Sequence, residues 1–88
     1  MKIRYDAHFL KEAQRLPKKT QVKLADLFAV LEQDPKSPLL HTKALSGKLA
    51  GLFSFRITRD WRVIFRFVDI DTIFLLAAKH RKDIYQEK

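Results

Sequence analysis

Hydrophobic residues in the first half of the chain recur with the period of a helix. Leu24, Leu27, Phe28 and Leu31 are spaced i, i+3, i+4 and i+7, which predicts an apolar stripe along one side of a helix. The dipeptide Asp34-Pro35 ends this helix, because the residue before a proline is disfavoured in the helical conformation.

A shorter helix is expected just before it. Phe9, Ala13 and Leu16 lie on one face of this segment, and the side chain of Asp6 is placed to cap its free amides. Pro17 interrupts the pattern, since proline is tolerated in the first turn of a helix but not in its middle. Two adjacent helices are therefore predicted, with apolar faces that need a sheet to cover them.

From Leu52 onward the period changes to two, which is typical of strands. Apolar and polar residues alternate over positions 53–58 and 61–68, and positions 72–78 are almost continuously apolar, as in a strand buried on both faces. Short turns are expected at Thr58-Arg59-Asp60 and Asp69-Ile70-Asp71.

The remaining segments complete the predicted order β-α-α-β-β-β. Alternation around Ile3 and Tyr5 predicts a short first strand, and Pro35 to Gly51 reads as a loop with one turn of helix around Lys43 to Leu45. We expect an α+β fold, an antiparallel sheet with a helical hairpin packed on one face, forming a single domain over residues 1–88.

The strand pattern places several cations together. Arg56 and Arg62 both occupy polar positions of neighbouring strands, which puts them on the sheet face that the helices leave uncovered. The last strand ends in Lys79, His80 and Arg81, at the rim of the same sheet. Three separate segments are thus expected to converge on one positive surface.

Composition adds a partner class to this picture. Lys plus Arg outnumber Asp plus Glu by 18 to 10, a formal charge of +8, which favours nucleic acid or an acidic protein as partner. The chain has no cysteine, so thiolate chemistry and disulfides are excluded. It has no signal peptide and no apolar run long enough to cross a bilayer, so we expect a soluble, cytoplasmic protein.

Each candidate side chain has a plain structural alternative. Arg56 is either a solvated strand arginine or a guanidinium fork for a phosphate. Arg62 lies within an otherwise apolar strand, which favours phosphate binding. His80 stands beside a basic cluster, and histidine, with an ordinary pKa of about 6.5, serves as acid or base near neutrality. Tyr85 either packs on a short terminal helix or stacks on a base.

Several kinds of site have no support in the sequence. There is no HExxH motif, no Cys/His cluster, no carboxylate pair at metal-binding spacing and no glycine-rich phosphate loop, so neither a metal nor a cofactor is expected. An enzyme built from Arg, Lys, His and Tyr suits RNA cleavage by the 2′-OH. That reaction needs a base, cations for the phosphorane and an acid for the 5′-oxygen.

Two stretches resemble the RelE/ParE superfamily of type II toxins. These are "GLFSFRITRDWRVIF" and the C-terminal "KHRKDIY", and the similarity extends over the order of elements in the whole chain. The resemblance implies an mRNA interferase that enters the ribosomal A site, contacts 16S rRNA and cuts the mRNA codon there. It also implies an acidic antitoxin that wraps and neutralises the toxin.

The resemblance further implies roles for single residues. Arg62 matches the strand arginine that stabilises the transition state, and Arg56 matches a basic residue that holds the phosphate. Lys79, His80 and Arg81 fall where the family places its cationic acid or histidine, with Lys82 beside them as a further substrate contact or a solvated charge. Tyr85 matches the terminal tyrosine that activates the 2′-OH or stacks on the substrate.

The sequence departs from its relatives at the general base. Relatives similar to YoeB carry a glutamate in the loop before the second strand, where "HTKALSGKLAG" contains no carboxylate. Relatives similar to RelE have two lysines near positions 54 and 56, where this chain has Ser54 and Arg56. The base is therefore left open between His80 and Tyr85.

Two other functions remain possible from the sequence. One is a ParE-like gyrase inhibitor, which uses the same scaffold on a protein target and cuts no RNA. The other is a basic domain that only binds RNA or an acidic protein. The retained His/Arg/Tyr set at the C-terminus favours the interferase over the gyrase inhibitor.

Overall fold

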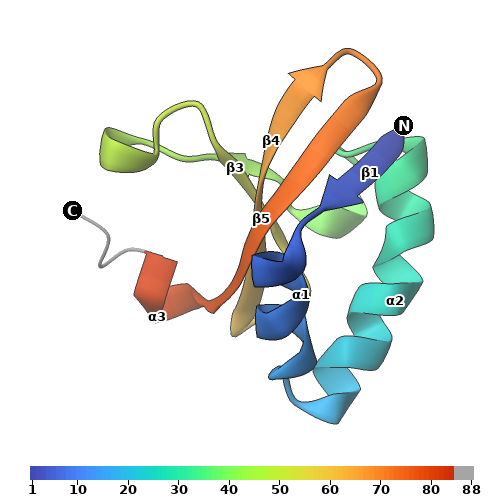
Figure 1. Cartoon of the computed structure of the whole chain (residues 1–88), viewed down its shortest axis with the longest axis vertical. Coiled ribbons are helices and arrows are strands. Elements are labelled where there is room, and N and C mark those ends of the chain that lie inside the picture. The colour runs from blue at the N-terminus through green and yellow to red at the C-terminus, as the bar shows by residue number, and fades with distance from the viewer. Residues whose placement is uncertain (85–88) are drawn as a thin grey trace.

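The computed structural model describes residues 1–84 of the chain (Figure 1). In order, its helices and strands are β1 (Lys2–Tyr5), α1 (Ala7–Gln14), α2 (Lys18–Gln33), β2 (Lys43–Ala44), β3 (Phe53–Arg56), β4 (Trp61–Asp69), β5 (Thr72–His80) and α3 (Arg81–Ile84). Two 3-10 turns, η1 (Pro38–Leu40) and η2 (Gly47–Leu49), lie between α2 and β3. The predicted α+β fold, with a helical hairpin on one face of the sheet, is confirmed.

The helical hairpin begins and ends where the sequence predicted. The Asp6 carboxylate accepts a hydrogen bond from the backbone N–H of Phe9 at 3.0 Å and caps α1. Pro17 stands at the N-cap of α2, and Asp34 closes that helix at its other end. Each break falls at a residue whose backbone geometry opposes a continuous helix.

The sheet has five strands in the order β1-β5-β4-β3-β2, antiparallel throughout except that β1 runs parallel to β5. The turn of helix expected around Lys43 to Leu45 is wrong. That segment is β2, which pairs with β3, and the N–H of Leu45 donates to the carbonyl of Leu52 at 2.9 Å. Hydrogen bonding to the free edge of β3 outweighs local helical preference in this short stretch.

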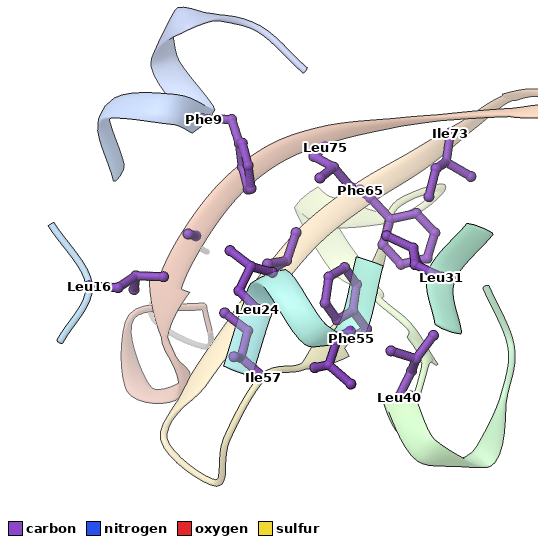
Figure 2. Close-up of a cluster of buried hydrophobic side chains, with 13 residues drawn as sticks. Phe9, Leu16, Leu24, Leu31, Leu40, Phe55, Ile57, Phe65, Ile73 and Leu75 are labelled. Atoms are coloured by element: carbon purple, nitrogen blue, oxygen red, sulfur yellow. The ribbon is translucent and has the colours of Figure 1, made fainter. Parts of the chain in front are cut away.

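The main core lies between the helical hairpin and one face of the sheet. Side chains from both helices and from β3, β4 and β5 form a single buried cluster, whose largest fully buried members include Phe55, Phe65, Leu31, Leu40, Ile73, Leu75 and Val63 (Figure 2). Figure 1 shows α2 running along one side of the sheet, with α3 on the opposite side. The sheet face that carries the main core is therefore covered by the helical hairpin.

The opposite face is only partly covered. Ile64 of β4, Ala77 of β5 and Ile84 of α3 form a second, smaller cluster, which leucines from the segment around η2 help to cover. Ser54, a polar position of β3 that pairs with Ile64, is buried on this side. Next to this small cluster the face carries the charged side chains of the candidate site. No helix within residues 1–84 is long and apolar enough to span a membrane.

Candidate functional site

A row of three cations crosses the partly covered face. Arg56 of β3 is the register partner of Arg62 of β4, and Arg62 is the partner of Lys79 of β5. Residues directly opposite one another in antiparallel strands project from the same face. The shared face that the sequence predicted for Arg56 and Arg62 is therefore confirmed. We call Arg56, Arg62 and Lys79 the cationic row.

The two arginines of the cationic row lack the partners that such residues usually have. Both are half-buried, and the Nε atom of each is buried without a hydrogen-bond partner among residues 1–84. Within that range neither forms an ion pair; Arg62 only donates from one terminal nitrogen to the carbonyl of Arg59 at 3.3 Å. Like charges directly opposite in a sheet repel each other, and a buried unsatisfied donor is costly. An anion placed between the two guanidinium groups would reduce both costs.

Lys79, the third member of the cationic row, is already paired. Its ammonium lies 3.0 Å from a carboxylate oxygen of Glu12, a residue of α1. The other oxygen of that carboxylate accepts a hydrogen bond from the backbone N–H of Ala78 at 3.0 Å and lies 3.4 Å from Nε2 of His8. No local pattern in the sequence points to this carboxylate, because 66 positions separate Glu12 from Ala78.

His80 follows Lys79 and pairs in register with Trp61 at the start of β4. The two rings meet edge to face, with their centroids 5.1 Å apart. Nδ1 of His80 accepts a hydrogen bond from the backbone N–H of Lys82 at 3.4 Å. Because an accepting Nδ1 must keep its lone pair, the neutral imidazole in this arrangement carries its proton on Nε2.

Arg81 is attached to the turn between β3 and β4. Its backbone N–H donates to the carbonyl of Asp60 at 2.7 Å, and its Nε lies 3.6 Å from the Asp60 carboxylate. Both side chains are about half exposed, so this ion pair is solvated and easily exchanged for another anion. The same turn contains Arg59, whose carbonyl contacts Arg62.

For two candidate residues, Lys82 and Tyr85, the described part of the chain gives no side-chain contact with the site. The side chain of Lys82 is exposed on α3, and the structure uses only its backbone, as the donor to His80. Tyr85 lies outside the described residues, so its expected position over the site stays a prediction. The structure thus brings together Arg56, Arg62 and Lys79, and adds Glu12. His80, the last residue of β5, projects from the opposite face, and Arg81 begins α3.

Other parts of residues 1–84 offer no comparable site. An apolar groove between α1 and α2, lined by residues such as Phe9, Leu24 and Phe28, has no charged residue in its lining. No group of three or more His, Cys, Asp or Glu side chains in this range lies close enough to hold a metal ion. Within residues 1–84, the buried side-chain donors without a partner are the Nε atoms of Arg56 and Arg62 in the cationic row.

Solved structures of bacterial and archaeal toxins are similar to this chain. A chain of the toxin–antitoxin complex RelBE2 from Mycobacterium tuberculosis is 26% identical, with a TM-score of 0.75 and coverage of 91% of this chain and 96% of that chain. A chain of the archaeal RelE–RelB complex from Pyrococcus horikoshii OT3 is also 26% identical, with a TM-score of 0.71 and coverage of 91% and 93%.

A third structure shares the fold at lower identity. The YoeB/ParE toxin from Agrobacterium tumefaciens is 23% identical, with a TM-score of 0.74 and coverage of 91% of this chain and 98% of that chain. No protein-family model matches the sequence, and a search of curated sequences gave no significant match.

Proposed function

Because this chain belongs to the RelE/ParE toxin superfamily, we propose that it is the toxin of a type II toxin–antitoxin system and acts as a ribosome-dependent mRNA endoribonuclease. In this proposal the toxin cuts the codon in the ribosomal A site by attack of the RNA's own 2′-OH, and so stops translation. Two of the similar solved structures are complexes of a toxin with an antitoxin. This supports a cognate antitoxin as the protein partner of this chain.

One observation carries the proposal. Arg56 and Arg62 stand directly opposite each other with no carboxylate paired to either among residues 1–84 and with both Nε atoms buried and unsatisfied. A guanidinium fork matches the oxygens of a phosphate, and charge-assisted hydrogen bonds of this kind are the stronger ones. A scissile phosphate placed here would satisfy both donors and remove the repulsion between the two arginines.

The chemistry needs no metal and no covalent enzyme intermediate. The 2′-oxygen attacks the adjacent phosphorus while the 2′-OH loses its proton to a base, and the bond from phosphorus to the 5′-oxygen breaks. Arg62 and Arg56 stabilise the added negative charge on the phosphorane oxygens. The departing 5′-oxygen takes a proton from the ammonium of Lys79 near the end of β5, while Arg81 at the start of α3 stabilises the negative charge that develops there. The products are a 2′,3′-cyclic phosphate and a 5′-hydroxyl.

The general base is assigned to Tyr85 rather than His80. His80 alternates with Lys79 along β5 and packs on Trp61, so its ring projects from the sheet face opposite the cationic row. This leaves the 2′-OH proton to Tyr85, the other residue that the sequence offered for this role.

The test is induced expression of the chain, with mRNA ends and DNA breaks mapped in the same cells. We expect mRNA cuts in frame with codons, with 5′-hydroxyl ends, and no gyrase-linked DNA breaks. Gyrase-linked breaks with intact mRNA would replace the proposal by the gyrase inhibitor. Binding of RNA with neither lesion would leave a non-catalytic basic domain.

A purified system makes the same test on a single substrate. Ribosomes programmed with one short mRNA are mixed with the protein, and the cut is mapped to the nucleotide. Cleavage in the A-site codon that requires the ribosome supports the proposal, whereas equal cleavage of free mRNA contradicts its ribosome-dependent part. The variant Tyr85→Phe should lose cleavage while remaining folded, and undiminished cleavage would return the base to His80.

A further inference from the structure

The outer edge of β5 has two different neighbours along its length. β1 pairs with β5 from Thr72 to Leu75 only. Beyond that point the strand continues to His80, and within residues 1–84 no further strand pairs with its outer edge. The helix α1 packs against β5 instead. The half of β5 that delivers Lys79 and His80 to the candidate site is thus supported by a helix rather than by a ladder of strand hydrogen bonds.

Glu12 of α1 supplies the missing hydrogen-bond acceptor at this edge. One carboxylate oxygen accepts from the backbone N–H of Ala78 at 3.0 Å, and the other lies 3.0 Å from the ammonium of Lys79. The Glu12 side chain is only 17% exposed, against 33% for Lys79. A partly buried carboxylate is retained where its oxygens are satisfied. Here both oxygens contact β5, and the one that accepts from Ala78 also lies 3.4 Å from Nε2 of His8.

The same carboxylate is connected to the cationic row. Lys79 is the register partner of Arg62, so the ion pair with Glu12 fixes where the third cation of the row can lie. Without Glu12, three cations would stand side by side across adjacent strands, and repulsion would drive the flexible lysine away from Arg62. Glu12 therefore sets both the position of the strand end and the position of the ammonium.

We propose that Glu12 is a positioning residue for the proposed cleavage: its carboxylate holds the Lys79 ammonium and the end of β5 so that Lys79 serves the scissile phosphate beside Arg62. This inference rests on the proposed function and adds a residue to it. Glu12 does not take the proton of the 2′-OH itself, because each of its oxygens already contacts β5 and the side chain is largely shielded from solvent.

The test compares Glu12→Gln, Lys79→Met and the double variant in single-turnover cleavage of mRNA on programmed ribosomes. The amide oxygen of glutamine can still accept from Ala78, but the ion pair with Lys79 is lost. We expect Glu12→Gln to lower the cleavage rate at saturating protein by about 10- to 100-fold, since misplacing a reacting group by about 1 Å has effects of that size. Thermal unfolding of each variant selects an assay temperature at which all are folded.

The double variant separates positioning from stability. If Glu12 acts through Lys79, then Glu12→Gln has no further effect once Lys79 is methionine, whereas a general loss of stability would add to the loss from Lys79→Met. Glu32→Gln is the matched control, because Glu32 is exposed on α2 and makes no hydrogen bond or ion pair within residues 1–84. It should cut mRNA at the wild-type rate.

Each outcome decides the matter. Wild-type cleavage by Glu12→Gln, or an undiminished effect of Glu12→Gln in the Lys79→Met background, overturns the role of Glu12 and leaves the proposed function standing. A wild-type protein that leaves ribosome-bound mRNA intact overturns the proposed function, and the role of Glu12 with it.

Discussion

Two adjacent rows of register partners run across β3, β4 and β5, one residue apart along each strand. One row is apolar and buried, and the other is cationic. Phe55, Val63 and Ala78 are register partners across β3, β4 and β5, and all three are buried in the main core. The next residues in register are the cationic row, Arg56, Arg62 and Lys79. The first row packs against the helical hairpin, whereas the second projects from the opposite face and contains the two Nε atoms that have no hydrogen-bond partner among residues 1–84.

The difference shows how a small fold can carry a destabilising site. Because side chains alternate between the two faces of a strand, the same backbone that places the cations also places the apolar row that holds the three strands together. Repulsion between Arg56 and Arg62 is opposed by burial of the residues beside them. We therefore expect substitutions in the apolar row to lower the free energy of unfolding. Substitutions in the cationic row should lower activity and leave the free energy of unfolding nearly unchanged.

The largest effect is expected from breaking the apolar row. Phe55 is fully buried, with 0% of its surface exposed, and Phe55→Ala should lower the free energy of unfolding by about 3–5 kcal/mol because it leaves a cavity in the core. Urea denaturation followed by circular dichroism measures this. Ile70→Ser, at a hairpin tip that is 91% exposed, is the control and should change it by less than about 0.5 kcal/mol.

Removing the central cation should affect activity instead. Arg62→Ala is expected to lower mRNA cleavage on programmed ribosomes by about 10²- to 10³-fold, as for loss of one donor to a developing oxyanion. Its free energy of unfolding should stay within about 1 kcal/mol of wild type. Arg15→Ala removes an exposed arginine at the C-cap of α1 and should leave cleavage unchanged. An Arg62→Ala variant that cleaves normally would remove the cationic row from the mechanism.

A smaller effect tests whether the cationic row is under repulsion. Replacing Arg56 by methionine keeps much of the aliphatic side chain but removes the charge opposite Arg62, so Arg56→Met should stabilise the free protein by about 0.5–1 kcal/mol. Added salt should stabilise the wild type more than the variant, because it screens the repulsion. Urea titrations at low and high salt measure both quantities. Destabilisation by Arg56→Met would mean that the two arginines do not repel.

The smallest effect is expected beside the row rather than in it. The Lys82 side chain is exposed on α3, so Lys82→Ala should weaken RNA affinity by a factor of about two to five, as for a solvated ion pair of up to about 1 kcal/mol. The slope of log affinity against log salt should fall by about 0.7 if one phosphate contact is lost. Fluorescence anisotropy over a salt series checks this. An unchanged slope would exclude Lys82 from the RNA contact.

The sequence predicted the parts of the fold that depend on local pattern. The helices, their breaks at Pro17 and Asp34, and the two-residue period of the long strands follow from side-chain spacing and backbone preference. Alternation also sufficed to place Arg56 and Arg62 on one face, because face depends only on whether a position is odd or even along its strand.

What depends on distant contacts was not predictable in this way. The two-residue strand β2 forms because it pairs with β3, and Ser54 is buried because leucines around η2 and Ile84 of α3 cover its face. Glu12 carries no local signal for its contacts with Ala78 and Lys79, since in its helix it is one more polar residue. The roles of His80, Arg81 and Tyr85 stay predictions, because they concern a substrate.

The contact between Glu12 and Ala78, 66 residues apart, bears on when activity can first appear during synthesis. A nascent chain that still lacks β5 has neither Ala78, which donates to Glu12, nor the strand that pairs with β1. Contacts between residues far apart in the sequence form late, because closing the long loop between them costs conformational entropy. The contacts of Glu12 with β5 therefore form only after β5 has left the ribosome that made it. Under the proposed function, a nascent chain that has not yet released β5 lacks a complete site and does not cut mRNA.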